Sequence, residues 1–470
     1  MLPIVEFPKL VEHYAPFFVD VFSADAFVEF KRYISGLLLS ENKTVEGINR
    51  MCVCESRNQS SLNRLLTQSP FQLTALDEQR LALLASLPET RLKATGVLSI
   101  DDTLLIHYGK HFEKIAYLWD HVHNCYRWAH NLVSLHYSDN ATDYPLYYQL
   151  WEPPDLAKLE AGLRDAGVTL KASKCALKES APKQWRQYLL GVWRRNQQCP
   201  DVAALHATKL RLAEQLLTQW VQRHPEGQLP VTFDNWYTQP GFCQFLDTTL
   251  QLAYVGTLAP SDQVVLKTGT ETLEHFAARL KQEHLDNVAD GRRLVFNAIS
   301  IPYKGQPEHY FSYCATHRVQ HFGQHRVVIN HRHADLSDKP VFLMCNRLHW
   351  QAPGITRIRR HRWPIEVYYE EGKAEGLDQY QLRDFAAVQR HVACVAVVYC
   401  LLRAAQHDQA LRDMLQSELK LELEGSVPFW RRTTQTENLW NLGLFIQAGL
   451  TQGQPLHSIM APLLQAVCAA

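Results

Sequence analysis

Acidic residues at three separate points of the chain have the type and placement to do chemistry together. Asp101 and Asp102 follow an apolar, strand-like run, Asp234 follows another, and Glu366 lies near the start of a late apolar helix. Each of them alone is more often a turn or cap residue than a ligand. Because a carboxylate beside a buried apolar run needs a partner, their common placement favours a bound cation such as a metal ion.

The late helix carries further groups that suit a charged substrate. Pro364 is tolerated only in the first turn of a helix, so we expect the helix to begin there, with Glu366 in the first turn and Lys373 on the same face. One interpretation is a solvated face of ion pairs. The other is a site for a phosphodiester, because four cations precede the helix with no acidic residue among them. These cations are Arg357, Arg359, Arg360 and Arg362.

This segment resembles the signature of bacterial insertion-sequence transposases of the RNase H-like DDE superfamily, in the branch marked by Tyr, Arg, Glu and Lys. Arg362, Glu366 and Lys373 match with three and six residues between them, whereas Arg359 stands at the family's Tyr position. The resemblance covers about residues 95–404. It includes three further runs, which are Ile100–Thr103, Phe233–Tyr237 and Gly376–Arg383.

The resemblance implies an α/β protein with an RNase H-like mixed-sheet catalytic core, a β-rich insertion and helical regions at both ends. The expected divisions are 1–90 (helical, DNA-binding), 91–260 (first part of the core), 261–350 (β-rich insertion), 351–404 (last part of the core) and 405–470 (helical). The implied function is a DNA transposase that binds the terminal inverted repeats of its element, with cut-and-paste cleavage and strand transfer through a hairpin intermediate. Expected partners are the repeats, target DNA and a second copy of the chain.

Roles for individual residues follow from the same resemblance. Asp102, Asp234 and Glu366 would hold two Mg²⁺ ions, with Mn²⁺ able to substitute. Asp101 remains the alternative to Asp102, because adjacent residues of a strand point to opposite faces. The residues expected to contact DNA are Arg359, Arg362 and Lys373, with Trp350 as a candidate for stacking on a flipped base.

The first 90 residues favour a pair of short helices joined by a turn. A helix-turn-helix would place Asn63 and Arg64 toward a DNA groove, and an ordinary helical pair accounts for the pattern equally well.

Charge and cysteine usage narrow the class of protein. The chain has 48 Lys and Arg against 48 Asp and Glu, so a DNA-binding surface has to be local, and the five arginines between Arg347 and Trp363 favour the late helix as its place. Eleven cysteines without paired CxxC spacing, and an N-terminus without a signal peptide, predict a cytoplasmic protein that is not associated with a membrane. The resemblance implies that it is bacterial and associated with the nucleoid. The functional alternatives are a non-catalytic DNA-binding descendant, such as a repressor or targeting factor, and a nuclease without strand transfer.

Overall fold

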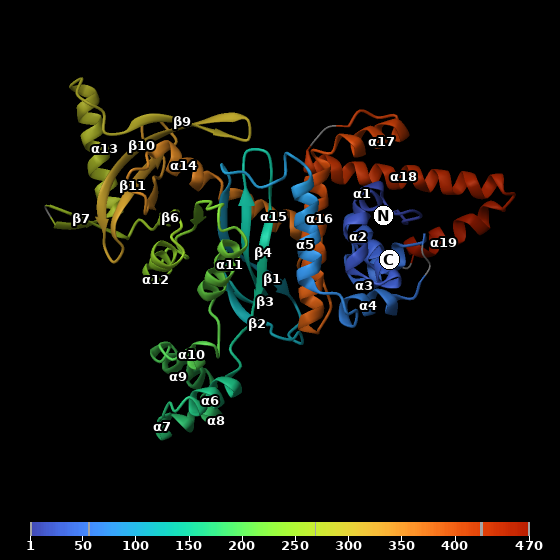
Figure 1. Cartoon of the computed structure of the whole chain (residues 1–470), viewed down its shortest axis with the longest axis horizontal. Coiled ribbons are helices and arrows are strands. Elements are labelled where there is room, and N and C mark those ends of the chain that lie inside the picture. The colour runs from blue at the N-terminus through green and yellow to red at the C-terminus, as the bar shows by residue number, and fades with distance from the viewer. Residues whose placement is uncertain (1, 55–56, 268, 424–425, 469–470) are drawn as a thin grey trace.

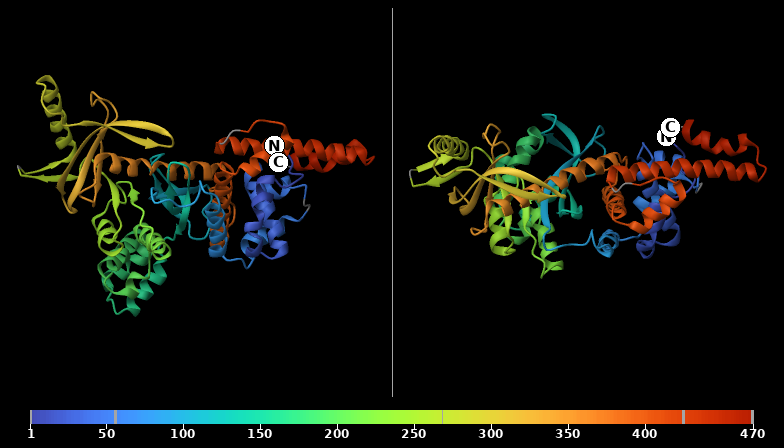
Figure 2. Two further views of the ribbon diagram at one scale, coloured as in Figure 1. Left: turned by 45° about the horizontal axis from the view of Figure 1, so that its top comes forward. Right: turned by 90° about the horizontal axis from the view of Figure 1, so that it is seen from above.

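The protein is elongated, with a central sheet flanked by two unequal ends (Figures 1 and 2). The computed structural model describes residues 2–54, 57–267, 269–423 and 426–468. A β-rich part lies at one end and the helices of both termini lie together at the other, while a small group of helices projects from one side of the sheet.

The core sheet is mixed and has the RNase H-like order. Strands β1 (Val97–His107), β3 (Cys125–Ser138) and β4 (Asp143–Trp151) form an antiparallel meander. Strands β5 (Val231–Phe233) and β6 (Tyr254–Leu258) run parallel to β1, which gives the order β4-β3-β1-β5-β6. The expected α/β class with an RNase H-like core is therefore confirmed.

Helices cover both faces of this sheet. Helix α11 (Lys209–Arg223) packs on β3 and β4, and α15 (Trp363–Ala374) packs on β4 and β1. Helix α15 begins beside Pro364, as its sequence predicts. Because successive side chains of β1 point to opposite faces, one of the neighbours Asp101 and Asp102 faces α15 and the other faces α11.

The β-rich end continues the same sheet. Strand β12 (Val341–Cys345) pairs antiparallel with β6, and β11 (Gly323–His331) and β10 (Gln306–Val319) follow. We call residues 263–345 the β insertion. Its remaining elements are β7 (Gln263–Leu266), β8 (Gly269–Thr272), α13 (Leu273–Ala289) and β9 (Asn297–Tyr303). Helix α14 (Ala352–Arg360) leads from it to α15, and this separate helix was not predicted from the sequence.

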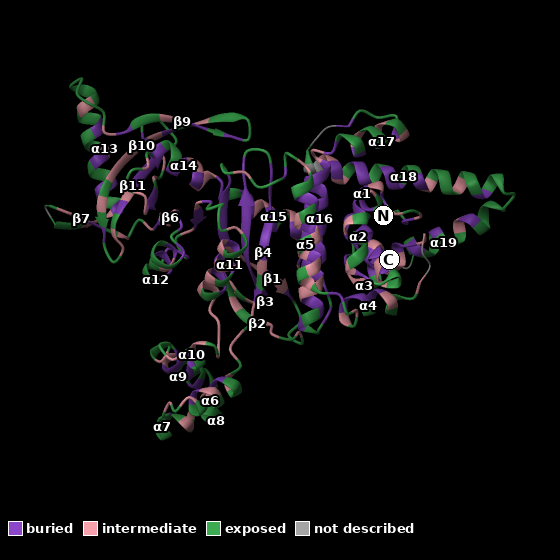
Figure 3. Cartoon of the chain, in the orientation of Figure 1, coloured by how far each residue is buried: buried purple, intermediate pink, exposed green. Residues whose placement is uncertain are grey.

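Both termini pack around the apolar helix α16 (Phe385–Ala405), which lies in the protein core (Figure 3). It is the one helix in the described ranges long and apolar enough to cross a membrane, and 78% of its most apolar window is buried within the protein. Its neighbours include α2 (Ala24–Leu39), α4 (Gln59–Thr67) and α5 (Leu73–Ser86). The other terminal helices are α1 (Lys9–Tyr14), α3 (Val45–Met51), α17 (Gln409–Leu419), α18 (Val427–Thr451) and α19 (Leu456–Cys468).

A group of helices between β4 and β5 has a small core of its own. We call residues 156–206 the helical insertion. Its buried residues include Leu159, Leu189 and Trp193, which pack together apart from the main core. Its elements are α6 (Leu156–Asp165), α7 (Ala172–Cys175), α8 (Leu177–Ser180), α9 (Pro182–Arg195) and α10 (Pro200–Ala203).

Candidate active site

Asp101 lies on the face of β1 that is covered by the late helix. The Arg362 guanidinium donates a hydrogen bond to Asp101 Oδ2 at 2.7 Å and also pairs with Glu366 one turn further along the helix. Tyr369 OH donates to the backbone oxygen of Asp101 at 2.8 Å. These contacts hold α15 on β1 and place the carboxylates of Asp101 and Glu366 on either side of one guanidinium.

Asp234 joins this group from the neighbouring strand. It directly follows Phe233, whose register partner on β1 is Ile100, the residue before Asp101. Its Oδ1 accepts hydrogen bonds from the backbone N–H groups of Trp236 (3.0 Å) and Tyr237 (3.1 Å), which fixes the turn after β5. The end of β5 therefore brings Asp234 close to Asp101, which lies within β1.

The pKa of Asp101 reflects its burial and the charged groups around it. Burial raises it to about 7, the Arg362 guanidinium opposes the rise, and the carboxylates of Asp234 and Asp102 add to it. Asp101 is thus a carboxyl group that needs nearby positive charge to stay ionised.

Asp102 occupies a different environment on the opposite face of β1. Its carboxylate accepts hydrogen bonds from Lys209 Nζ at 2.9 Å, Asn131 Nδ2 at 2.6 Å and Tyr237 OH at 2.9 Å. Lys209 also lies 4.1 Å from the ring centroid of Trp236. Asp102 therefore ties the start of α11 to the turn that carries Asp234, and its charge is already balanced.

The donor set around Arg362 suits a hard cation. Carboxylate oxygens are the ligands that Mg²⁺ and Mn²⁺ prefer, and the guanidinium between Asp101 and Glu366 shows that positive charge is stabilised at this position. Across the described ranges, no three His, Cys, Asp or Glu side chains are grouped tightly enough to hold a metal ion. A cation at Asp101 and Glu366 would therefore have to displace the Arg362 head group.

Arg359, at the position of the family's Tyr, lies beside the same carboxylates. Burial, followed by the charge of Arg362, lowers its pKa to about 10, while Glu366, Asp234 and Asp101 act in the other direction. Its Nε is buried and has no hydrogen-bond partner within the part of the chain that the structure describes. An unpaired, buried N–H group of this kind can donate a hydrogen bond to an anion such as a phosphate.

The other arginines near α14 have partners within the fold. Arg360 Nε pairs with both carboxylate oxygens of Glu308 in the β insertion, at 2.9 and 3.0 Å. Arg347 lies 3.7 Å from Asp247, and Arg357 donates to the backbone oxygen of Thr95 at 2.9 Å. Arginines with no acidic neighbour in the sequence thus find acceptors far along the chain.

The remaining expected DNA contacts are more scattered. Lys373 is half-buried two turns after Glu366, close enough to Asp378 to affect that carboxyl group's pKa. Trp350 is partly buried against a small apolar cluster beside α14. Asn63 and Arg64 are exposed on α4, at the far end of the molecule from the β insertion (Figure 1).

One aromatic residue near the site was not singled out from the sequence. Trp363 is 50% exposed and lines a cavity of about 390 Å³ together with Arg359, Arg360, Arg332 and Lys339. Its place directly before Pro364 in the late helix was the available signal.

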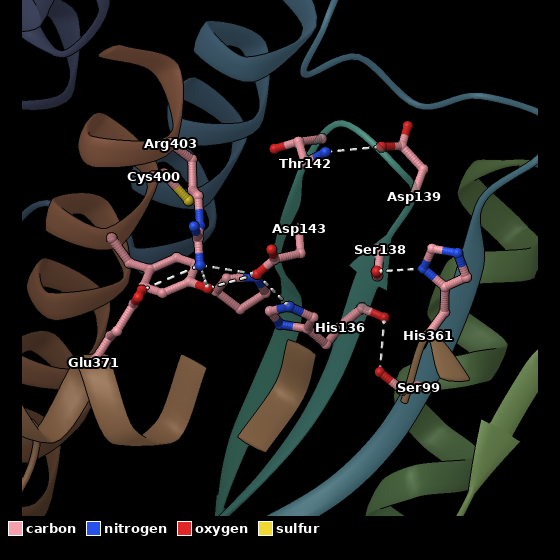
Figure 4. A network of polar contacts seen from close by, with 12 residues as sticks. Ser99, His136, Ser138, Asp139, Thr142, Asp143, His361, Glu371, Cys400 and Arg403 are labelled. Atoms are coloured by element: carbon pink, nitrogen blue, oxygen red, sulfur yellow. Dashed lines mark hydrogen bonds and ion pairs between the residues drawn. The ribbon is translucent and has the colours of Figure 1, made fainter. Parts of the chain in front are cut away.

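A buried network fixes the late helices to the sheet (Figure 4). Arg403 on α16 donates from Nη2 to Asp143 on β4 and to Glu371 on α15, both at 3.1 Å. Burial alone would raise the pKa of Asp143, but the charge of Arg403 and a hydrogen bond from His136 hold it well below its usual range. Lys304 of the β insertion reaches the same carboxylate at 3.3 Å, so one acidic residue joins three parts of the fold.

The mixed sheet and the helices on both of its faces define the class: a protein with an RNase H-like core. The family model described as "DDE superfamily endonuclease" matches residues 16–277, and the chain belongs to this family. The match contains Asp101, Asp102 and Asp234 and ends before Glu366. No curated protein matches the sequence. Enzymes of this superfamily act on DNA and generally use divalent metal ions.

Proposed function

We propose that the protein is a DNA transposase that binds the terminal inverted repeats of its own insertion sequence and performs metal-dependent cut-and-paste cleavage and strand transfer. The observation that carries the proposal is the pairing of the Arg362 guanidinium with both Asp101 and Glu366, with Asp234 near Asp101 and the unpaired donor of Arg359 beside them. Membership of the DDE endonuclease family supports nuclease activity in general.

Within this proposal Asp101 is the first acidic residue of the site. It shares its face of the sheet with Glu366 and interacts with Asp234, whereas Asp102 is held by Lys209, Asn131 and Tyr237. Asp102 then positions the turn that carries Asp234.

Asp101, Asp234 and Glu366 would hold the metal ions, with Mg²⁺ as the proposed species. Bound there, divalent ions activate the attacking oxygen and stabilise the leaving oxygen of a phosphodiester. Arg359 and Arg362 bind phosphate oxygens next to the scissile bond, because a guanidinium matches phosphate geometry with two donors. Lys373 contacts the backbone further along the same helix face.

A hairpin intermediate requires an aromatic surface for a base that leaves the duplex. Trp363 is better placed for this role than Trp350, since it is half-exposed beside a basic cavity while Trp350 is partly buried. The proposal assigns end recognition to the N-terminal helices through Asn63 and Arg64, and pairing of the two ends to a homodimer.

A cleavage assay on duplex DNA that carries the element's terminal repeats tests the proposal. With Mg²⁺ present, the intact chain should cut at the repeat ends, and hairpin-ended products should appear. Glu366→Gln and Asp234→Asn should lower the cleavage rate by about three orders of magnitude or more, because each removes one carboxylate ligand.

Glu370→Gln is the matched control, because Glu370 is exposed one turn after Glu366 on the same helix. It should cut like the unaltered chain. DNA binding without any metal-dependent cutting by the intact chain would refute the transposase and favour the non-catalytic binding protein. Cutting without strand transfer would leave a nuclease.

A further inference from the structure

The helical insertion carries a net positive charge. Residues 156–206 contain nine Lys and Arg against four Asp and Glu, a net charge of +5. The rest of the chain then has 39 Lys and Arg against 44 Asp and Glu, a net charge of −5. A neutral protein thus contains one compact unit of strong positive charge.

Helix α9 carries most of this charge on its outer side. It has four cations and no acidic residue over Pro182–Arg195. Trp185, Leu189, Val192 and Trp193 are buried in the small core. At 3.6 residues per turn, Lys183 and Arg194 lie on the side opposite these residues, with Gln187 between them, and Arg186 flanks that side. All four of these polar side chains are exposed.

These cations are not needed to stabilise the insertion. Lys183, Arg186 and Arg194 have no ion-pair partner within the described ranges, whereas Arg164 and Lys178 of the same unit both pair with Glu160. Lys183 also lies in the first turn of α9, where the helix dipole disfavours positive charge. Exposed cations without partners, one of them placed against the dipole, therefore indicate a binding surface.

The insertion contacts the end of β4 at the start of α11. Trp151 Nε1 at the end of β4 donates to the backbone oxygen of Ala207 at 3.0 Å, and the His206 ring packs against both Trp151 and Trp193. Burial, and then the charges of Arg186 and Arg194, lower the pKa of His206, so both guanidiniums lie near this junction. Two residues further, Lys209 begins α11 and pairs with Asp102.

We infer that the outer face of α9, formed by Lys183, Arg186, Gln187 and Arg194, binds the phosphate backbone of duplex DNA. The inference rests on the proposed function for the identity of the polyanion. Lys183 and Arg194 are eleven residues apart, about 16 Å along the helix, and duplex DNA carries a charge about every 1.7 Å of its axis. The face can therefore meet several phosphates, and it contributes affinity without reading sequence.

The test compares two triple variants of the full chain in binding to a labelled duplex of random sequence, with EDTA present to prevent cutting. The test variant is Lys183→Gln/Arg186→Gln/Arg194→Gln. The matched control, Arg164→Gln/Lys178→Gln/Arg211→Gln, removes the same number of charges from cations that already have carboxylate partners. All six side chains are exposed, so both variants should unfold at the same urea concentration as the unaltered chain.

The test variant should bind at least about tenfold more weakly at physiological salt, and the slope of log affinity against log salt should fall by about two to three, while the control keeps both values. Equal loss in both variants would overturn the inference, because net charge alone would then account for binding. Unchanged affinity in the test variant would overturn it too. If the triple variant unfolds, single Lys183→Gln should still lower the slope by about one. Failure of the proposed function would appear separately, as an intact chain that binds DNA but never cuts the element's ends.

Discussion

Positive charge gathers in two regions of this molecule, the α14–α15 segment and the helical insertion, and the protein treats it differently in each. In the first, Arg362 and Arg360 lie among carboxylates and Arg359 is buried. In the second, Lys183 and Arg194 are exposed and have no ion-pair partner in the described ranges. The first region is built to hold charge in a defined geometry, and the second is free to meet a partner.

The difference shows what a cluster of basic residues means once the fold is known. Cations that are paired and buried contribute to stability and to the precise placement of reacting groups, so their loss should disturb folding or catalysis. Exposed cations without partners contribute little to folding, so their loss should change salt-dependent binding instead. The following predictions test this division.

The largest effect is expected from substitution of Asp101, whose carboxylate pairs with Arg362. Asp101→Asn should lower Mg²⁺-dependent cleavage by about three orders of magnitude or more, because the site loses a ligand, and DNA affinity in EDTA should stay unchanged. Asp102→Asn should lower the cleavage rate by only about 10- to 100-fold, since that residue positions its neighbours. Single-turnover cleavage rates check both values, and the reverse order would assign the first ligand to Asp102.

Removal of the buried cation should mainly affect stability. Arg362→Gln leaves Asp101 and Glu366 facing each other without a counter-charge, so the free energy of unfolding should fall by about 3 kcal/mol. Arg186→Gln in the helical insertion should change it by less than about 0.5 kcal/mol. Urea unfolding of the two variants in EDTA makes the comparison, and equal stabilities would contradict the division between the regions.

Two buried histidines should each make the protein less stable in acid without weakening the exposed surface. Burial lowers the pKa of His361, next to Arg362, and of His391 on α16 to about 4. Between about pH 6.5 and 4 the unfolded chain therefore binds protons at these positions that the folded chain does not, and each histidine should contribute a loss of roughly 2 kcal/mol of stability on going from pH 7 to pH 5. Asp101 acts in the opposite direction, because burial raises its folded pKa to about 7.

Urea unfolding at the two pH values measures this loss, and His391→Gln should reduce the slope. Neither histidine belongs to the α9 surface, so the affinity of the folded chain for a random duplex at constant salt should change little. A binding curve that follows the stability curve would argue against separate roles.

The smallest effect distinguishes two arginines of equal charge. Arg360 pairs with Glu308 and its guanidinium lies 3.8 Å from the ring centroid of Tyr303. Arg360→Gln should lower stability by about 1 kcal/mol and leave the salt slope of DNA binding unchanged. Arg194→Gln should do the opposite, with a slope reduced by about one. Fluorescence anisotropy over a range of salt concentrations resolves the difference.

Local features of the fold could be predicted from the sequence. The RNase H-like class and the late helix with Pro364 in its first turn follow from short patterns, whereas the acidic site of Asp102, Asp234 and Glu366, with Asp101 as the alternative, stays a prediction. The face of β1 could not be predicted, because Asp101 and Asp102 alternate across the sheet and only the packed helices tell them apart.

Contacts between segments far apart in the chain could not be predicted from the sequence either. Arg360 finds its acidic partner Glu308 across 52 positions of the chain, so a run without acids looked like free charge. The helical insertion was missed although its signals were present, in the Pro153–Pro154 break and in the excess of basic residues after it.

The pairing of β12 with β6 has a mechanical consequence. Four register pairs, from Phe342 with Leu258 to Cys345 with Val255, carry the backbone ladder directly from the catalytic core into the β insertion. Bending between β6 and β12 would break hydrogen bonds in the middle of a sheet, so the core and the β insertion should move as one rigid body. The helical insertion is attached by two connecting segments and by the contact of the His206 ring with Trp151. Any adjustment to the curvature of a bound duplex would therefore fall to this unit, while the carboxylates keep their geometry.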